Sequence, residues 1–444
     1  MAEINLKKNI ILSSSFRSVV LVLSFLMGWV STRYLGVDLK GRQGYLITIG
    51  SFGWMILDMG LFRSYPYLVR KYPEKYDTLL KWSMLTFIAE TAILGFLGLA
   101  FLRLWSRILD FDFSLLYIIY FVGFITVSKV LMQVQSLFVG LDDIYHSSVG
   151  YFLNSFVGFA LMATVFFGAL GQDRLSYALA AGVLAPLLAF LYLAWHSNWR
   201  GWLGKLDLAF IRKSYGFGLR VFISSLFILL LIRVDVIILK QLRGYAEVGI
   251  YSLAGHIVDM LQVLSNLVGS LLLVKLADTP DDKAKWLMMK KMLLVFVVFL
   301  SIANLGFILL GKIMLRVVFG VEFVPAYYSY LWLIPASYGL SFGSLFNNYL
   351  NSKGFPLVSI ILPAIALVVN IGLNLLLIPV WGMYGAAFAT SVAYLLWFVL
   401  IIAYEHQASG NQMLKYLIPK KDDWLQLWGM FGETVRIGLN RVRR

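Results

Sequence analysis

The chain has 444 residues, of which 60% are hydrophobic and 14% charged, whereas soluble domains carry about 25% charged residues. Apolar runs of membrane-spanning length recur throughout, so the composition excludes an ordinary soluble protein. The net charge of +15 would suggest a nucleic-acid partner in a soluble protein, but most of these cations lie between the apolar runs, so we expect no such partner. Because cysteine is absent, disulfides, cysteine-based zinc sites and thiol chemistry are excluded.

The apolar runs predict an all-α integral membrane protein of about twelve transmembrane helices joined by short loops. The first run follows a short basic segment and is too long for the apolar part of a cleavable signal peptide, so we expect a permanent span. The expected spans are 10–32, 44–65, 79–102, 114–139, 147–170, 176–196, 215–240, 247–273, 289–311, 323–351, 355–379 and 382–404.

Lysine and arginine are concentrated in alternate connections, which predicts that both termini are cytoplasmic. From Trp424 onward, apolar residues recur at helical spacing and are accompanied by arginines. This pattern is typical of a helix that lies on an anionic membrane surface, and a plain solvated tail is the alternative.

A weak internal repeat relates the two halves of the chain at an offset of about 203 to 211 residues. Arg17 in the first expected span corresponds to Arg220 in the seventh, and Gly171 ends the fifth as Gly382 ends the eleventh. Since each half has an even number of spans, both halves enter the membrane in the same sense, as in transporters with two parallel lobes. We expect an N-terminal six-helix lobe at 1–200, a C-terminal six-helix lobe at 201–407 and a basic amphipathic cytoplasmic tail at 408–444.

Charged residues inside the expected spans predict a polar cavity between the lobes. A charge near the bilayer centre costs about 2.5–3.5 kcal/mol or more, so such groups face a cavity, pair with one another or reach toward the interface. The residues concerned are the cations Arg17, Lys129, Arg220 and Arg233 and the acids Asp58, Glu90, Asp235 and Asp259.

The four cations favour an anionic substrate with a large apolar part. Arginine binds phosphate oxygens through two parallel hydrogen bonds, so a pyrophosphate attached to a long lipid fits a cationic cavity beside lipid. We expect all four to bind this substrate, although Arg17 and Arg220 could instead reach toward the interface. Asp58, Glu90 and Asp259 are candidate cavity or gating acids, with structural pairing between helices as the alternative.

Several segments resemble the polysaccharide flippases, the Wzx-like O-antigen flippases of the multidrug/oligosaccharidyl-lipid/polysaccharide (MOP) exporter superfamily. The most specific is 370–391 (NIGLNLLLIPVWGMYGAAFATS). The others are 35–45 (LGVDLKGRQGY), 58–66 (DMGLFRSYP), 235–239 (DVIIL) and 248–254 (VGIYSLA). The resemblance extends over the chain to about residue 407.

The resemblance implies the MOP flippase fold, with two pseudo-symmetric six-helix lobes around a central cavity. It also implies alternating-access movement of an undecaprenyl-pyrophosphate-linked oligosaccharide, an O-antigen, capsule or exopolysaccharide repeat unit, from the inner to the outer leaflet of a bacterial cytoplasmic membrane. Ion gradients or membrane potential would drive it, since the chain lacks a G-x-x-x-x-G-K-[ST] phosphate loop. The implied partners are this glycan, membrane lipid, and the polymerase and glycosyltransferases of the same pathway.

The resemblance also implies a site for a coupling cation, Na⁺ or H⁺, and no other cofactor. In lipid II flippase relatives, sodium is held by an Asp of the seventh span, an Asn and an Asp on the eleventh and a Thr on the twelfth. Asn374 replaces one of these carboxylates, which leaves a proton on Asp235 as the alternative to sodium and hydrogen bonding between helices as the structural alternative. The matching residues are Asp235, Asn370, Asn374 and Thr390.

Other functions fit the sequence less well. A small-molecule or drug antiporter of the same superfamily would share the fold, but a carrier of cationic drugs is expected to favour acids in its cavity. An enzyme is suggested only by Asp110 and Asp112, an acidic pair of the kind that holds a metal in lipid-dependent glycosyltransferases. The loop around this pair is too short for an acceptor-binding domain, so we expect no enzymatic activity.

Overall fold

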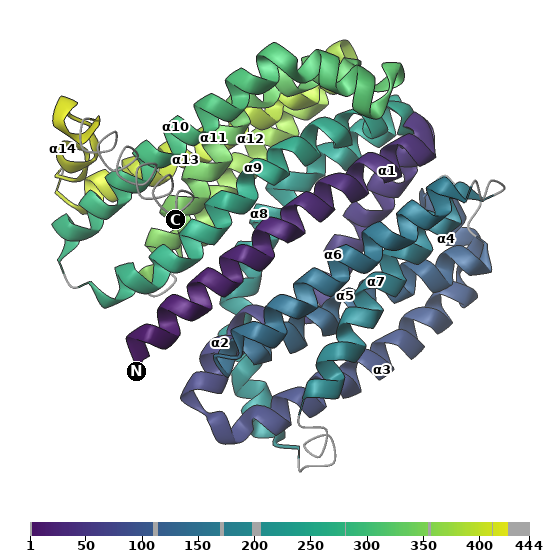
Figure 1. Cartoon of the computed structure of the whole chain (residues 1–444), viewed down its shortest axis with the longest axis horizontal. Helices are drawn as coiled ribbons and strands as arrows, with labels where there is room; N and C mark the ends of the chain where they lie inside the picture. Colours follow the sequence, from purple (N-terminus) through teal and green to yellow (C-terminus); the bar gives the residue numbers. More distant parts are fainter. Residues whose placement is uncertain are drawn as a thin grey trace, which may run out of the picture. The chain divides into compact units, whose positions relative to one another are not determined.

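The computed structural model describes residues 2–109, 114–168, 173–197, 206–279, 281–353, 357–410 and 412–424. Every regular element in these ranges is helical, which confirms the all-α prediction (Figure 1). Within the same ranges, nine helices are long and apolar enough to cross a membrane. The chain is therefore a multi-pass membrane protein.

The first of these helices covers the first expected span and most of the second. α1 (Ala2–Asp58) runs through 10–32 and ends within the expected span 44–65, and its backbone leaves the helical region at Gly36, where φ is 70° and ψ is −176°. Met59 and Gly60 also have positive φ, and α2 (Leu61–Lys71) begins directly after them. Glycine adopts such a conformation at little steric cost, so Gly36 is the natural place for the chain to change direction between the two spans.

The helices that follow reproduce the other expected spans. Up to residue 278, the helices are α3 (Tyr76–Ala100), α4 (Leu102–Leu109), α5 (Leu115–Gly140), α6 (Ile144–Phe167), α7 (Arg174–His196), α8 (Leu208–Arg243) and α9 (Tyr245–Asp278). The later ones are α10 (Asp282–Met314), α11 (Pro325–Ser352), α12 (Val358–Trp381), α13 (Met383–Ala408) and α14 (Met413–Leu417). The expected spans 247–273 and 323–351 correspond to α9 and α11, which are not among the nine helices above.

The chain divides into two compact units. The first comprises Met1–Ser252 and Val318–Glu322, and the second comprises Leu253–Val317 and Phe323–Arg444. α8 and the start of α9 therefore belong with the first unit. The lobe boundaries expected from the sequence remain a prediction.

In the first unit, α5 is the central helix. It packs against α1, α2, α3 and α7, and α6 packs between α1 and α7. The helices of this region, purple to teal in Figure 1, enclose a core of fully buried side chains. Its members include Tyr65, Leu79, Val130, Val134 and Leu193.

α8 is capped at the cytoplasmic end expected from the sequence. The side chain of Asp207 accepts a 2.9 Å hydrogen bond from the backbone N–H of Phe210, which satisfies one donor of the first helical turn. Lys75 Nζ lies 2.6 Å from the other carboxylate oxygen. The hydrogen bond from Lys75, reinforced by the backbone bond, holds the pKa of Asp207 below its ordinary value.

In the second unit, α13 is the central helix. It packs against α11, α12 and α14, and α10 packs against α11 and α14. The described part of the tail is attached to α10, because Lys290 Nζ is 2.7 Å from a carboxylate oxygen of Asp423. Residues 425–444, which hold most of the expected interfacial helix, lie outside the described ranges.

A close contact between glycines fixes how α1 meets α9 within the first unit. A Cβ atom at Gly249 would overlap the carbonyl oxygen of Val37, and one at Gly41 would overlap the carbonyl oxygen of Tyr245. Both obstacles are backbone atoms, which cannot rotate away. Only glycine at both positions permits this approach, as at other close helix crossings in membranes.

Replacing Gly249 by Ala should destabilise the protein, because the two backbones must separate to admit the methyl group. Overpacking of this kind costs about 1–3 kcal/mol. The thermal unfolding midpoint of the purified protein in detergent measures it. Gly255→Ala is the control on the same helix, since a Cβ there meets nothing within 4 Å. An unchanged midpoint in Gly249→Ala would contradict the close contact.

Candidate functional site

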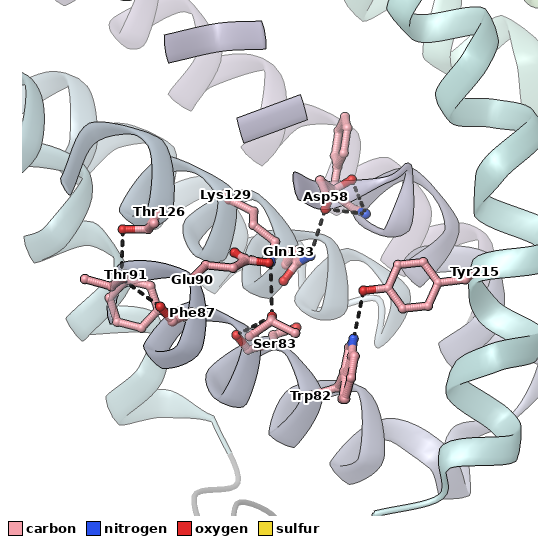
Figure 2. Close-up of polar contacts among 12 residues, drawn as sticks. Asp58, Trp82, Ser83, Phe87, Glu90, Thr91, Thr126, Lys129, Gln133 and Tyr215 are labelled. Atoms are coloured by element: carbon pink, nitrogen blue, oxygen red, sulfur yellow. Dashed lines mark hydrogen bonds and ion pairs between the residues drawn. The ribbon is translucent and has the colours of Figure 1, made fainter. Parts of the chain in front are cut away.

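A buried ion pair joins α3 and α5 in the first unit. Lys129 on α5 is 1% exposed, and its Nζ donates to the two carboxylate oxygens of Glu90 on α3 at 2.6 and 2.7 Å (Figure 2). The same ammonium donates to Thr86 Oγ1 at 3.0 Å. All three of its protons therefore have acceptors, which is the condition under which a buried charge is tolerated.

Asp58 lies beside this pair and is also almost completely buried. Gln133 Nε2 donates to Asp58 Oδ1 at 2.8 Å (Figure 2). The backbone N–H of Phe62 lies 3.2 Å from both carboxylate oxygens. Because the chain turns at Met59 and Gly60, the Asp58 carboxylate faces the first turn of α2, where free N–H groups and the helix dipole favour an anion.

Sequence spacing explains why these side chains meet. Thr126, Lys129 and Gln133 follow one another at steps of three and four along α5, so they share one helix face. Helical spacing therefore predicts a polar stripe on α5. A facing stripe on α3 was not expected from the sequence; there Thr86 and Glu90 are four residues apart and Ser83 lies one turn earlier.

Asp58, Glu90, Lys129 and Gln133 form what we call the polar network of the first unit. Its two carboxylates and one ammonium leave one more acid than base. In the conformation described, Lys129 is engaged by Glu90 and not presented alone to a ligand. The roles expected of Lys129 in substrate binding, and of Asp58 and Glu90 in gating, stay predictions.

The other expected cations lie on α1 and α8. The side chains of Arg17 and Arg220 lie outside the described residues, although both belong to continuous helices. Arg233 is half-buried on α8. Their expected role as ligands of an anionic head group is therefore still a prediction.

Asp235 on α8 is 2% exposed and is held by α9. The hydroxyl of Tyr251 donates to Asp235 Oδ2, and the backbone N–H of Val236 lies 2.7 Å from Oδ1. Gly244, with a φ of 86°, separates the two helices, and Asp235 and Tyr251 lie at similar distances along the chain on either side of it. An antiparallel turn of α8 and α9 at Gly244 brings Tyr251 beside Asp235, so the sequence contains a signal for this pair.

The other residues expected at the cation site are in the second unit. Asn374 Nδ2 donates to the carbonyl oxygen and to Oδ1 of Asn370, each at 2.9 Å, so the expected one-turn pair is in direct contact on α12. Both side chains are fully buried, and among the described residues Asn374 Oδ1 has no hydrogen-bond partner. Thr390 is buried on α13, the helix that packs against α12.

An oxygen such as Asn374 Oδ1, buried and without a donor, is chemically suited to a hard cation. The four residues expected at the cation site do not all lie in one unit, however, because Asp235 belongs to the first unit and the other three to the second. Asp259 is half-buried on α9 in the second unit. The acidic pair Asp110 and Asp112 lies outside the described ranges, and within those ranges no three His, Asp or Glu side chains are placed to hold a metal.

Replacing Lys129 by Met should strongly destabilise the first unit, because the Glu90 carboxylate would lose its counter-charge in a buried position. Breaking such a pair costs about 3–5 kcal/mol. The double variant Lys129→Met/Glu90→Gln should recover much of this loss, since it removes both charges. The thermal unfolding midpoint in detergent measures all three proteins.

Lys285→Met is the control for this cycle. Lys285 pairs with Asp282 at 3.3 Å, and that acid is 55% exposed, so its loss should leave the midpoint nearly unchanged. Equal midpoints for Lys129→Met and the double variant would mean that the pair does not contribute as a unit.

Comparisons with known proteins identify the family. The model of a family described as polysaccharide biosynthesis protein matches residues 6–274, which is more than half of the chain. No curated protein matches the sequence significantly.

Solved structures with the same fold include three MOP proteins. A multidrug resistance MATE family transporter in an inward-facing conformation matches with a TM-score of 0.71 at 12% identity, over 92% of this chain and 98% of that one. The lipid II flippase MurJ in an inward closed conformation gives 0.68 at 13%, over 95% and 92%. A MOP superfamily transporter from Pyrococcus furiosus, described as having a binding pocket of reverse polarity, gives 0.62 at 13%, over 94% and 96%.

These likenesses show the fold, and the family model shows the family. Together they support a transporter or flippase of the MOP superfamily, in agreement with the resemblance seen in the sequence. Transporters and flippases are not enzymes. The chain belongs to the polysaccharide biosynthesis protein family and has the MOP superfamily fold.

Proposed function

We propose that this protein is a flippase that moves an undecaprenyl-pyrophosphate-linked oligosaccharide from the inner to the outer leaflet of a bacterial cytoplasmic membrane. The observation that carries the proposal is the combination of family and fold. The family is that of polysaccharide biosynthesis proteins, and the fold is that of membrane transporters. A transporter that serves polysaccharide assembly needs a glycan cargo, and a glycan built on a lipid carrier must change leaflet before it can be used outside.

The chemistry of the spans supports an anionic head group. Arg17, Arg220 and Arg233 all lie on helices of the first unit, and arginine binds the oxygens of a pyrophosphate bidentately. In this proposal these arginines, with Lys129 where Glu90 releases it, hold the pyrophosphate while the polyprenyl tail stays in lipid. A structural likeness to a lipid II flippase is consistent with such a cargo.

Alternating access is the proposed mechanism. Binding of a cation or proton near Asp235, or at the asparagine pair of α12, returns the empty carrier to the inward state. One elementary charge that crosses 100 mV changes the free energy by about 2.3 kcal/mol. This is enough to shift two conformations whose free energies differ by a few kcal/mol.

A small-molecule or drug antiporter is the second candidate. The MATE transporter matches this chain with a slightly higher TM-score than the flippase does, 0.71 against 0.68, so the fold by itself does not discriminate between the two cargoes. The charge of the cargo discriminates between them. A cationic drug would be repelled by the arginines that a pyrophosphate requires.

Proteoliposomes that contain the protein should move a fluorescent undecaprenyl-pyrophosphate oligosaccharide between leaflets, and Arg220→Ala should abolish this movement. Arg17→Ala should have the same effect, because each removes two charge-assisted bonds to the head group. Accessibility of the label to a membrane-impermeant quencher measures the movement. Arg316→Ala is the control, at a residue of the second unit on the short helical segment Leu315–Phe319.

Normal movement of the lipid in both Arg220→Ala and Arg17→Ala would contradict the assignment of these arginines as ligands of the head group. No movement by the wild type, even with a sodium or proton gradient imposed, would favour the antiporter, and uptake of a cationic dye would then be measured in the same vesicles.

The coupling ion is tested by restoring the missing carboxylate. Asn374→Asp should make transport more dependent on sodium, because a carboxylate in the asparagine pair raises affinity for a hard cation. Asp235→Asn should abolish the response to the ion gradient. Transport rates at varied sodium and at varied pH measure both effects.

Asn304→Asp is the matched control, since Asn304 is an equally buried asparagine of the same unit that is held by Tyr330 and Ser337. If Asn374→Asp and Asn304→Asp change the sodium dependence alike, the site on α12 has no special role.

A further inference from the structure

The first unit encloses a cavity that the polar network does not use. Its volume is about 280 Å³, and it is lined by residues of α1, α5, α6 and α7, with Gln43, Leu46 and Ile47 among those of α1. All of these helices belong to the first unit. The volume is close to the lower end of the range of about 300–1,000 Å³ found for small-ligand sites, so the cavity has room for a short part of a larger substrate.

The polar side chains that line this cavity are neutral, and several of them make no hydrogen bond to the protein. Five lining side chains have no hydrogen-bond partner among the described residues; they are Ser24, Tyr120, Ser128, Asn154 and Ser155. No Lys, Arg, Asp or Glu is among the lining residues. The five unpartnered side chains are half-buried, and their polar groups are available to a polar ligand in the cavity.

The aromatic and small residues define the shape of the ligand. Tyr117, Tyr120, Phe121 and Phe124 lie along one face of α5 and supply broad apolar surfaces. The lining residues that α7 contributes are instead mostly small, among them Gly182. Sugar rings carry hydroxyl groups at their edges and apolar C–H groups on their faces. They therefore fit a cavity with aromatic residues on one side and small residues on the other.

A second pocket of the same unit shows the contrast. It has a volume of about 360 Å³ and is lined almost entirely by apolar side chains of α1, α3 and α5, such as Ile49, Leu94 and Val122. Phe121 lines both pockets. The polar lining is therefore a property of the first cavity and not of the cavities of this unit in general.

We propose that the cavity between α1, α5, α6 and α7 binds neutral sugar units of the transported glycan, with Tyr120 and Asn154 as hydrogen-bonding residues. This inference rests on the proposed flippase function and deepens it. Without a charged side chain, the cavity is unsuited to a pyrophosphate, which requires cations, and to a cationic drug, which is stabilised by acids. The sugars and the pyrophosphate are thus bound by different sets of residues.

Gly182 is a position from which a side chain can enter the cavity. It lines the cavity, and a Cβ atom there meets nothing within 4 Å, so the first atom of the Leu side chain in Gly182→Leu is accommodated without a clash. This variant should bind undecaprenyl pyrophosphate bearing a neutral trisaccharide at least about tenfold more weakly than the wild type, the loss expected when several hydrogen bonds to a ligand are blocked. Binding of sugar-free undecaprenyl pyrophosphate should be unchanged.

Tyr120→Phe is the second variant, because it removes a single hydroxyl group with almost no change in volume. It should weaken binding of the trisaccharide-bearing lipid by a smaller factor and leave binding of the sugar-free lipid unaffected.

Gly306→Leu is the matched control for Gly182→Leu, since a Cβ at this exposed glycine of α10 also meets nothing within 4 Å. Tyr177→Phe, at an exposed tyrosine of α7, is the control for Tyr120→Phe. Microscale thermophoresis in lipid nanodiscs measures each affinity.

The outcomes separate this inference from the function on which it rests. If Gly182→Leu and Tyr120→Phe bind both lipids as the wild type does, or lose both equally, the sugar site is overturned while the flippase proposal stands. If the wild type binds neither lipid, the flippase proposal itself is contradicted. If Gly182→Leu loses binding of tetraphenylphosphonium that the wild type shows, the cavity is a site for cationic compounds and the sugar assignment is overturned.

Discussion

The core of a bilayer contains no water, so a polar side chain inside a span is stabilised only by other protein groups or by a ligand. The first unit meets this constraint in two ways. In the polar network, Lys129 donates three bonds to Glu90 and Thr86, and Gln133 donates to Asp58. In the cavity beside α7, five neutral polar side chains have no protein partner among the described residues. The first arrangement stabilises the helix bundle, and the second is available to a substrate.

This separation bears on how one protein can carry a substrate of mixed chemistry. A lipid-linked glycan has an apolar tail, a doubly charged linkage and a neutral sugar chain, and each part requires a different environment. Apolar pockets, arginines and uncharged hydroxyl and amide groups all occur within the first unit. In our proposals each part of the substrate is bound by groups of matching chemistry, so that no charge of the substrate is buried without a counter-charge.

Backbone geometry supplies the second constraint. At Gly41 and Gly249 the main chains of α1 and α9 come closer than any side chain would permit, and Gly36 and Gly60 provide the positive φ values at which the first spans change direction. Close contacts of small residues are how helices associate where lipid removes the hydrophobic driving force. These glycines hold the helices that carry Asp58 and Asp235 in fixed positions, so they connect the packing of the first unit to its buried acids.

The sequence by itself determined the class of the protein and the extent of its helices, because spans are set by hydrophobic length and every backbone group in a span must bond within its own helix. It also determined that Lys129 and Gln133 share a face of α5 and that Asn370 and Asn374 are neighbours on α12, since helical spacing fixes both. Periodicity shows which side chains share a face but not which helix that face meets. Only the tertiary structure decided that Lys129 bonds to Glu90, that Asp235 bonds to Tyr251, and that five neutral polar side chains from three helices line one cavity. These contacts join residues far apart in the chain, and they depend on how the helices pack.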